Sequence, residues 1–202
     1  MQGLQLTSER IAMEARRGVW PDRVITEFLD RWIAERPGET AVVSFREEGG
    51  SATRLSWSEL GDRVGAIARG LSAAGIGKGD VVSFQLPNWW EFVAIHLACV
   101  RLGAISNPLM PIFRRRELSF MLRHTESKVF IAPALFRGFD HGALALELKA
   151  EIPSLEHVFL VGGAGEHSFE DQLLGGVPAG SPVSGTALGP NDVVCRQVGK
   201  KC

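Results

Sequence analysis

VVSFQLPNWWEFVAIHLACVRLGAISNP, residues 81–108, is the stretch that decides the fold. Its first part, Val81–Leu86, is a mainly apolar run of the length expected for a buried strand. A longer apolar stretch follows and continues to Leu102, which predicts a helix. Ala104–Pro108 is short enough to be a second strand. A strand, a helix and a strand in close succession favour a parallel pair joined by a right-handed crossover.

The two ends of this helix carry separate signals. Asn88 is followed three residues later by Glu91, a spacing that predicts a capped helix N-terminus. Gly103 comes after the last apolar position and predicts a helix end in the left-handed conformation. Ser56 and Glu59 repeat the capping spacing upstream, where we expect another helix to begin.

The alternation of strands and helices extends in both directions from this segment. Downstream, the apolar spacing predicts a helix, a strand, a helix and a strand in turn, at 114–124, 129–132, 143–150 and 157–161. Upstream, it predicts a helix, a strand and a hairpin partner, at 25–33, 40–45 and 53–57. This order favours an α/β fold with a mainly parallel sheet flanked by helices.

The composition is typical of a soluble globular chain. Of the 202 residues, 45% are hydrophobic and 22% are charged, which is enough for one domain with a sizeable core. The formal net charge of −1 gives no electrostatic reason to expect nucleic acid or an anionic membrane as a partner. The longest apolar stretch, Phe92–Val100, is interrupted by His96 and is too short to span a bilayer.

The cysteines and the N-terminus favour a cytoplasmic protein. Cys99, Cys195 and Cys202 are odd in number and widely spaced, which does not suggest a disulfide framework. They also lack partners at the spacing of zinc ligands, so we expect no metal site. The charged N-terminal residues are not followed by the apolar segment of a secretory signal.

Five short elements follow one another in the order and at the spacing found in one family. They are Leu55–Leu60, Gly77–Val82, Leu86–Phe92, Arg101–Pro108 and Glu117–Val129. On these elements the chain resembles the adenylate-forming (AMP-binding) acyl-CoA synthetases, or acid–CoA ligases. Phe136–Asp140 is similar to the cyclohexanecarboxylate–CoA ligase type within that family. The resemblance implies an incomplete N-terminal subdomain of the adenylate-forming fold.

The resemblance also implies a ligase reaction in two steps. A carboxylate attacks the α-phosphate of ATP to give an acyl-adenylate and pyrophosphate, and the CoA thiol then displaces AMP. The family uses ATP, Mg²⁺ and CoA, and it holds phosphate with a loop of the form Tyr-Thr-Ser-Gly-Thr-Thr-Gly. Backbone N–H groups and a cation stabilise the charge that gathers on phosphate in such a reaction. The 202 residues contain no such loop.

The resemblance is lost abruptly near the C-terminus. Pro190–Val194 matches the strand entry that precedes the loop in the family, whereas Cys195–Cys202 resembles neither the loop nor the strand before it. We therefore expect a frameshift or an equivalent break after Val194, no catalytic residue in the chain, and a truncated fragment that is inactive alone. An unfinished sheet would leave an uncovered edge and apolar faces, which favours a marginally stable, aggregation-prone product.

These observations divide the chain into four parts. An N-terminal arm, residues 1–20, precedes a partial AMP-binding N-terminal domain, residues 21–161. Residues 162–194 are rich in glycine, proline and serine, and we expect them to form a linker with one short helical stretch around Phe169–Leu174. Residues 195–202 are expected to be a tail unrelated to the family.

Two arginines are the candidate CoA contacts. Arg114 begins a run of three arginines where a helix is expected to start, and positive charge there opposes the helix dipole, which suggests a nearby anion. Arg137 lies where relatives of the acetyl-CoA synthetase kind place an arginine near the CoA phosphates. For both residues, a solvated surface position is the alternative. Trp89 and Trp90 either line an acyl pocket or pack beneath the first turn of their helix.

Three functions are open at this point. The first is an N-terminal fragment of an ATP-dependent carboxylic acid–CoA ligase. The second is a non-catalytic module that binds CoA or an acyl group weakly. The third is an interaction fragment that pairs with a full-length ligase through its unfinished sheet. The residues do not indicate the acid substrate, because the family's acyl pocket is formed mainly by later parts of the protein.

Overall fold

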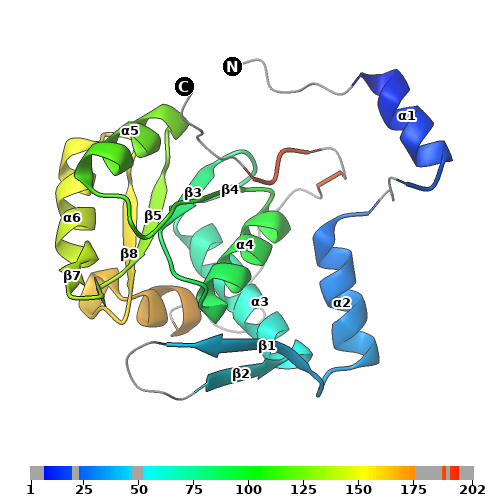
Figure 1. Cartoon of the computed structure of the whole chain (residues 1–202), viewed down its shortest axis with the longest axis horizontal. Coiled ribbons are helices and arrows are strands. Elements are labelled where there is room, and N and C mark those ends of the chain that lie inside the picture. The colour runs from blue at the N-terminus through cyan, green and yellow to red at the C-terminus, as the bar shows by residue number, and fades with distance from the viewer. Residues whose placement is uncertain (1–6, 20–22, 47–51, 176–187, 190–191, 196–202) are drawn as a thin grey trace.

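The computed structural model describes residues 7–19, 23–46, 52–175, 188–189 and 192–195. At its centre is a sheet of four strands in the order β4-β3-β5-β8 (Figure 1). These strands are β3 (Val81–Phe84), β4 (Ile105–Pro108), β5 (Val129–Pro133) and β8 (His157–Val161). All neighbouring pairs are parallel, and helices connect successive strands, as the sequence predicts.

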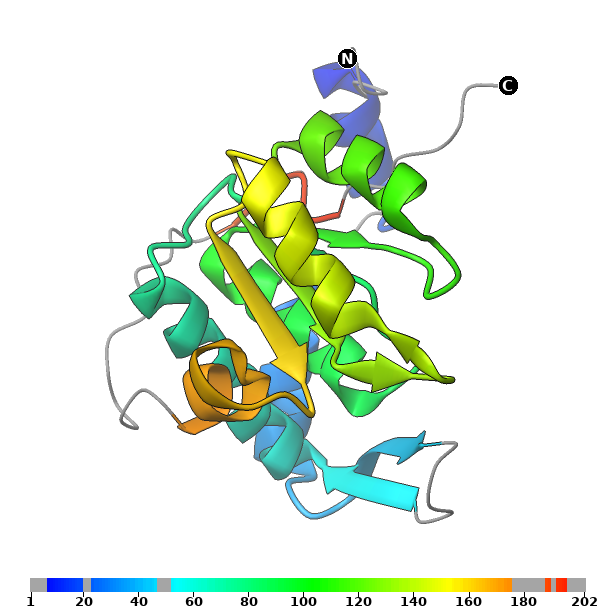
Figure 2. The ribbon, with the colours of Figure 1, turned by 90° about the vertical axis from the view of Figure 1, so that its left-hand side faces the viewer.

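Helices cover both faces of the sheet (Figures 1 and 2). On one face lie α3 (Trp57–Ala73) and α4 (Trp90–Leu102), and on the other lie α5 (Arg115–Thr125) and α6 (His141–Glu151). Successive strand residues point to opposite faces of a sheet. In β5, Ile131 therefore packs into the α3–α4 core and Phe130 into the α5–α6 core, and both side chains are fully buried.

Smaller elements surround these three layers. The helix α2 (Ile25–Glu35) packs against α3 and α4. An antiparallel hairpin of β1 (Thr40–Phe45) and β2 (Ala52–Ser56) lies beside α3, and a very short one of β6 (Leu135–Phe136) and β7 (Phe139–Asp140) lies between β5 and α6. The turn expected at 47–50 lies outside the described residues.

The structure confirms the α/β class and two of the helix-end predictions. The Ser56 hydroxyl accepts a hydrogen bond from the Glu59 N–H at 3.2 Å, and the Glu59 carboxylate accepts one from the Ser56 N–H at 2.8 Å. This is the predicted capping box at the start of α3. Gly103 has a φ of 74° and ends α4 in the left-handed conformation, as predicted.

The cap predicted at Asn88 is wrong. The N-cap of α4 is Trp89, and no side chain caps the helix there. The Glu91 side chain is instead buried, with 1% of it exposed, and forms an ion pair with Arg46 at the end of β1. The Glu91 carboxylate, which local spacing assigned to the helix cap, therefore pairs with Arg46 from another part of the chain.

The N-terminal arm contains a helix that we did not predict. Thr7 caps α1 (Ser8–Arg16), and its hydroxyl accepts a hydrogen bond from the Arg10 N–H at 3.3 Å. None of the residues of α1 is buried. Figure 1 shows this helix apart from the sheet and its covering helices. The helix therefore contributes nothing to the core.

We expected residues 162–194 to form a linker, but its first part, residues 162–175, packs against the rest of the fold. A 3₁₀ turn (Gly165–His167) and a π-helical turn (Glu170–Gly175) follow β8. Phe169 and Leu173 are 0% and 2% exposed and belong to the α3–α4 core. The glycine-rich composition hid these two anchors, which are four residues apart and so share one face of the turn. Residues 176–187 lie outside the described ranges.

Gly70 allows this segment to approach α3. A Cβ atom at Gly70 would lie 2.8 Å from the Leu173 Cα and 3.0 Å from the Gln172 carbonyl oxygen. We expect Gly70→Ala to lower the free energy of unfolding by about 1–3 kcal/mol, because backbone atoms must move apart. Gly65 on the same helix is the control, since its Cβ would meet only the end of the Arg69 side chain at 3.2 Å.

Gly65→Ala is expected to stabilise the chain by roughly 0.5–1 kcal/mol, the ordinary gain of alanine within a helix. Urea denaturation followed by circular dichroism would measure both variants. Equal stability of the Gly70→Ala variant and the parent chain would show that the turn at 170–175 does not pack against α3.

Residues 192–195 lie along the outer edge of β4. The Ser106 N–H donates to the Val194 carbonyl at 3.1 Å, and Ser106 and Cys195 form a parallel bridge. The Lys78 ammonium group pairs with Asp192 at 3.2 Å. Cys195, which we expected to begin an unrelated tail, therefore pairs with the sheet, and residues 196–202 lie outside the described ranges.

Candidate functional site

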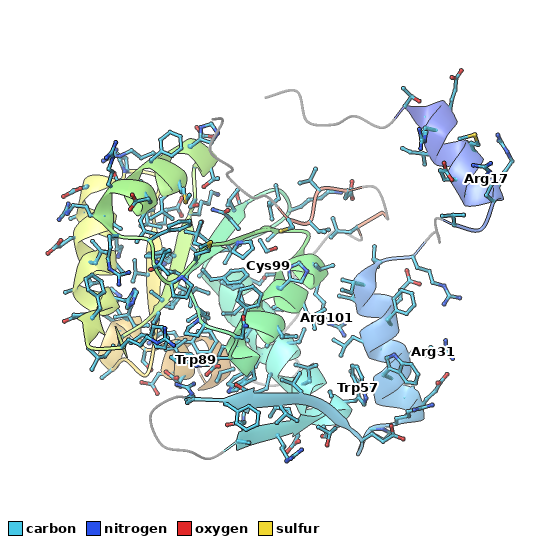
Figure 3. All side chains as sticks on the ribbon, viewed as in Figure 1. Arg17, Arg31, Trp57, Trp89, Cys99 and Arg101 are labelled. Atoms are coloured by element: carbon cyan, nitrogen blue, oxygen red, sulfur yellow. The ribbon has the colours of Figure 1, made fainter. Side chains whose placement is uncertain are left out.

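A groove of about 330 Å³ lies where β3, β4 and β5 end. Its lining residues are Phe45, Leu86, Pro87, Asn88, Trp89, Pro111, Phe136 and Arg137. We call it the strand-end groove. Figure 3 shows Trp89 at the sheet end that faces the β1–β2 hairpin. Ligands of open parallel sheets bind outside the carboxyl ends of the strands, so this groove is the candidate site.

A larger hollow of about 510 Å³ lies on the outer side of α3. It is lined mainly by α3 residues, with Leu174 from the following turn. Apart from Leu174, which comes well after β8, this hollow contains none of the residues that follow the parallel strands. Volume alone does not make a site, so the strand-end groove is the better candidate.

Two aromatic rings of the strand-end groove lie between two arginine side chains, of which Arg137 lines the groove and Arg46 lies beside it. The Arg46 guanidinium lies over the Trp89 ring, 4.2 Å from its centroid. The Trp89 and Phe136 rings meet edge to face at 5.7 Å, and the Arg137 guanidinium lies 5.3 Å from the Phe136 centroid. Such contacts hold guanidinium groups against ring faces. The groove thus combines flat apolar surfaces with positive charge.

The predicted packing of the tryptophan pair is confirmed. Trp89 and Trp90 are only 7% and 9% exposed and belong to the α3–α4 core. Trp89 also lines the strand-end groove, whereas its place in an acyl pocket stays a prediction. Trp90 does not line the groove.

Arg137 occupies an uncommon backbone conformation. It has a φ of 49° and is followed by Gly138 with a φ of 72°, and these two residues form the turn between β6 and β7. Two positive φ angles are typical of a type I′ hairpin turn, where asparagine followed by glycine is preferred. An arginine there is held at some conformational cost, which is consistent with a use for its side chain at the groove.

Arg114 lies near the same hairpin but does not line the groove. Its Nη1 donates to the carbonyls of Pro111 and Phe113 at 2.8 and 2.9 Å, and its guanidinium lies 4.1 Å from the Phe139 ring centroid. The neighbouring Arg115 forms ion pairs with α6. The first two arginines of the run therefore have partners within the chain, and contact of Arg114 with CoA stays a prediction.

Two buried polar residues behind the groove were not predicted from the sequence. Gln85 and His141 are 1% and 2% exposed, and the Gln85 Oε1 accepts a hydrogen bond from the His141 Nδ1 at 3.1 Å. Burial, with a smaller effect of Arg114, lowers the pKa of His141 to about 4, so the imidazole is neutral at neutral pH. A glutamine near the end of the mainly apolar run Val81–Leu86 was the available signal.

Glu91 is a buried carboxylate beside the groove. Burial raises its pKa, and the nearby Arg46 opposes that effect. Its Oε2 is buried and has no hydrogen-bond partner among the described residues. The Arg46–Glu91 pair fixes the end of β1 to the start of α4, next to Trp89.

The chemistry of this site is that of binding. Guanidinium groups and aromatic faces suit a ligand that carries phosphate and a planar ring. Within the described ranges, no group of three or more His, Cys, Asp and Glu side chains could hold a metal ion. None of the helices in those ranges is both long and apolar enough to cross a bilayer.

Comparison with protein families gives one match that covers most of the chain. The family model described as AMP-binding enzyme matches residues 29–195. A medium-chain fatty-acid–CoA ligase of Escherichia coli is 34% identical over 155 residues, which are 77% of this chain and 26% of that enzyme. A salicylyl-CoA synthase/salicylate adenylyltransferase of a Streptomyces species is 34% identical over 170 residues, 84% of this chain and 30% of that enzyme.

The structural comparison points the same way. The apo structure of Mycobacterium smegmatis MbtA has a TM-score of 0.80 and 25% identity, over 95% of this chain and 34% of that one. An anthranilate–CoA ligase in complex with anthranoyl-AMP has a TM-score of 0.65 at 21% identity, which supports the fold alone. The chain thus spans only 26% to 34% of the length of the relatives whose shares are quoted above.

Proposed function

Because the chain belongs to the AMP-binding enzyme family, we propose that it forms the N-terminal part of an ATP-dependent carboxylic acid–CoA ligase. In this reaction, a carboxylate attacks the α-phosphate of ATP, pyrophosphate leaves, and the CoA thiolate then displaces AMP from the acyl-adenylate. The functions of the relatives, CoA ligation and acid adenylation, support the reaction class. The fatty-acid substrate named for one relative belongs to that enzyme.

We assign the strand-end groove to the nucleotide part of CoA. The observation that carries this assignment is the Arg137 side chain in a groove with aromatic walls. A guanidinium can donate two parallel hydrogen bonds to one phosphate, and a ring face can stack on a base. The role of these residues is to bind and orient CoA. Arg114, which precedes α5, is a further candidate contact because its guanidinium lies against Phe139 of the β6–β7 hairpin.

The 202 residues tested by themselves are proposed to bind without turnover. They contain no Gly/Thr/Ser loop of the kind that holds ATP in this family. A non-catalytic CoA-binding module is the second candidate, and the groove favours it over a fragment that pairs with a full-length ligase.

The free thiols of Cys99 and Cys195 are consistent with a proposed cytoplasmic location.

Calorimetric titration of the chain with CoA tests this proposal. We expect saturable 1:1 binding, and binding of 3′-dephospho-CoA weakened roughly tenfold by the loss of charge-assisted hydrogen bonds. ATP–pyrophosphate exchange with a panel of carboxylic acids should give no signal above a protein-free control.

Each arm of the experiment can overturn one statement. No heat change with millimolar CoA would remove the groove assignment, while family membership would stand. Acid-dependent exchange would show that the 202 residues catalyse adenylation, contrary to the binding-only proposal. Equal affinity for CoA and 3′-dephospho-CoA would show that the 3′-phosphate does not contact the arginine.

A further inference from the structure

The Gln85 side chain connects three segments that follow the parallel strands. Gln85 itself comes directly after β3. Its Nε2 donates to the carbonyls of Met110 and Phe113, at 2.8 and 3.0 Å, in the loop after β4. Its Oε1 faces the Nδ1 of His141, the first residue of α6, beyond β5 and the β6–β7 hairpin. The buried Gln85 side chain thus contacts the segments that follow β4 and β5, the two neighbours of β3 in the sheet.

These contacts belong to a series of interactions that begins and ends at His141. The Phe113 carbonyl that accepts from Gln85 also accepts from Arg114 Nη1 at 2.9 Å. The Arg114 guanidinium covers Phe139, and the Phe139 ring meets the His141 ring edge to face at 4.8 Å. The series of contacts therefore leads back to His141. It lies behind the groove walls, which are formed by Pro111 on one side and by Phe136 and Arg137 on the other.

We propose that Gln85 and His141 are positioning residues, which set the distance between the Pro111 wall and the Phe136–Arg137 wall of the strand-end groove. A ligand that contacts both walls is bound well only when that distance is right. The identity of the ligand as CoA rests on the function proposed above. We call the side-chain hydrogen bonds of Gln85 to Met110, Phe113 and His141 the clamp. The clamp follows from these hydrogen bonds and does not depend on the identity of the ligand.

The hydrogen-bond roles in the clamp are fixed by the backbone. The Gln85 Nε2 must face two carbonyl acceptors, so Oε1 faces His141 and the imidazole carries its proton on Nδ1. Nε2 of His141 is buried with no partner among the described residues. Arg114 and Asp140 are the charged groups that influence the imidazole. A second proton on this ring would have no acceptor, so the clamp requires neutral His141.

Gln85→Leu tests the proposal, with Ser83→Ala as the matched control. Leucine is of similar size and removes all three side-chain hydrogen bonds of Gln85. Ser83 lies on β3 and is equally buried, and it bonds Ser127 and Asn107 at 2.6 and 2.8 Å, within a separate polar group. We expect Gln85→Leu to raise the Kd for CoA about tenfold or more, through misplaced groove walls, and Ser83→Ala to change it less than twofold at a similar loss in Tm.

A second measurement does not depend on the ligand. The amides of Phe113 and Gly142 donate to Met110 and Ala134 carbonyls at 3.0 Å each, one on each side of the clamp. Hydrogen exchange at both amides should accelerate in Gln85→Leu and stay unchanged in Ser83→Ala. His141→Phe should act like Gln85→Leu, and the double variant should add little to either single change, because both remove one unit.

The outcomes separate this inference from the function proposed above. If the parent chain does not bind CoA, the assignment of the groove to CoA fails, and hydrogen exchange still decides whether Gln85 holds both walls. If CoA binds and Gln85→Leu and Ser83→Ala weaken it equally, the effect is one of general stability and positioning is wrong. Unchanged exchange at Phe113 and Gly142 would also overturn the proposal.

Discussion

Replacing Phe130 by alanine is expected to lower the free energy of unfolding by about 3–5 kcal/mol, the range for a large buried aromatic side chain. Phe130 is the second residue of β5, is 0% exposed, and belongs to the core between the sheet and the helices α5 and α6. Alanine would leave a cavity in that core, to which Leu118, Leu122 and Leu148 also belong. Helices packed on a rigid sheet can close such a space only in part.

Phe120→Ala on α5 is the matched control. Its side chain is 59% exposed, so its removal should change the free energy of unfolding by less than about 0.5 kcal/mol. Urea denaturation curves of both variants and the parent chain provide the comparison. Since a domain has a total stability of about 5–15 kcal/mol, Phe130→Ala should shift the midpoint strongly. Similar midpoints for the two variants would mean that the α5–α6 core does not form.

The prediction also bears on whether the chain folds by itself. From the sequence we expected a marginal, aggregation-prone product, because the sheet would have an uncovered edge. In the described residues, both edges of the sheet have a parallel bridge, Ser106 with Cys195 beside β4 and Leu160 with Ser168 beside β8. A cooperative melt that is lost in Phe130→Ala would show that the two cores suffice for folding.

Local spacing predicted most helices and strands, because those signals lie within a few residues. It could not predict which local pattern would be used for capping. Ser56–Glu59 and Asn88–Glu91 have the same spacing, yet only the first forms a capping box. Arg46 lies 45 residues from Glu91 in sequence and forms an ion pair with it in the fold. A long-range partner therefore decided the difference, and no local rule contains it.

The sequence indicated the candidate site only in part. The family resemblance pointed to Arg137, which lines the groove, and the run of arginines at a helix start pointed to Arg114, which lies behind one wall. Gln85 and His141 are 56 residues apart in sequence, and their contact arises from the crossover that places β3 beside β5. Composition was misleading at Phe169 and Leu173, because a glycine-rich context hid two core residues.

Arg137→Asn is expected to weaken CoA binding without loss of stability. Removal of a guanidinium that donates to phosphate costs about 1.5–3 kcal/mol, or roughly a 10- to 100-fold increase in Kd. Asparagine followed by glycine is the preferred pair for the turn that Arg137 and Gly138 form, with φ angles of 49° and 72°. The Tm should therefore stay the same or rise, which separates a loss of binding from a loss of folding.

Two further variants make the test specific. Arg137→Lys keeps the charge but loses the planar fork, so its Kd should fall between those of the parent chain and Arg137→Asn. Arg31→Asn removes the same charge from α2, on the side of the molecule away from Trp89 in Figure 3. It should change the Kd for CoA less than about twofold, because a distant exposed charge is screened by salt.

Titrations at two salt concentrations distinguish a direct contact from a general electrostatic attraction. A direct Arg137–phosphate contact predicts that Arg137→Asn weakens binding at both concentrations, since a partly desolvated pair is screened less than exposed charges. Equal losses in Arg137→Asn and Arg31→Asn that vanish at high salt would show that only net charge matters. Unchanged binding in Arg137→Asn would move the phosphate contact elsewhere, and Arg114 would then be the residue to replace, since it lies nearest the same hairpin.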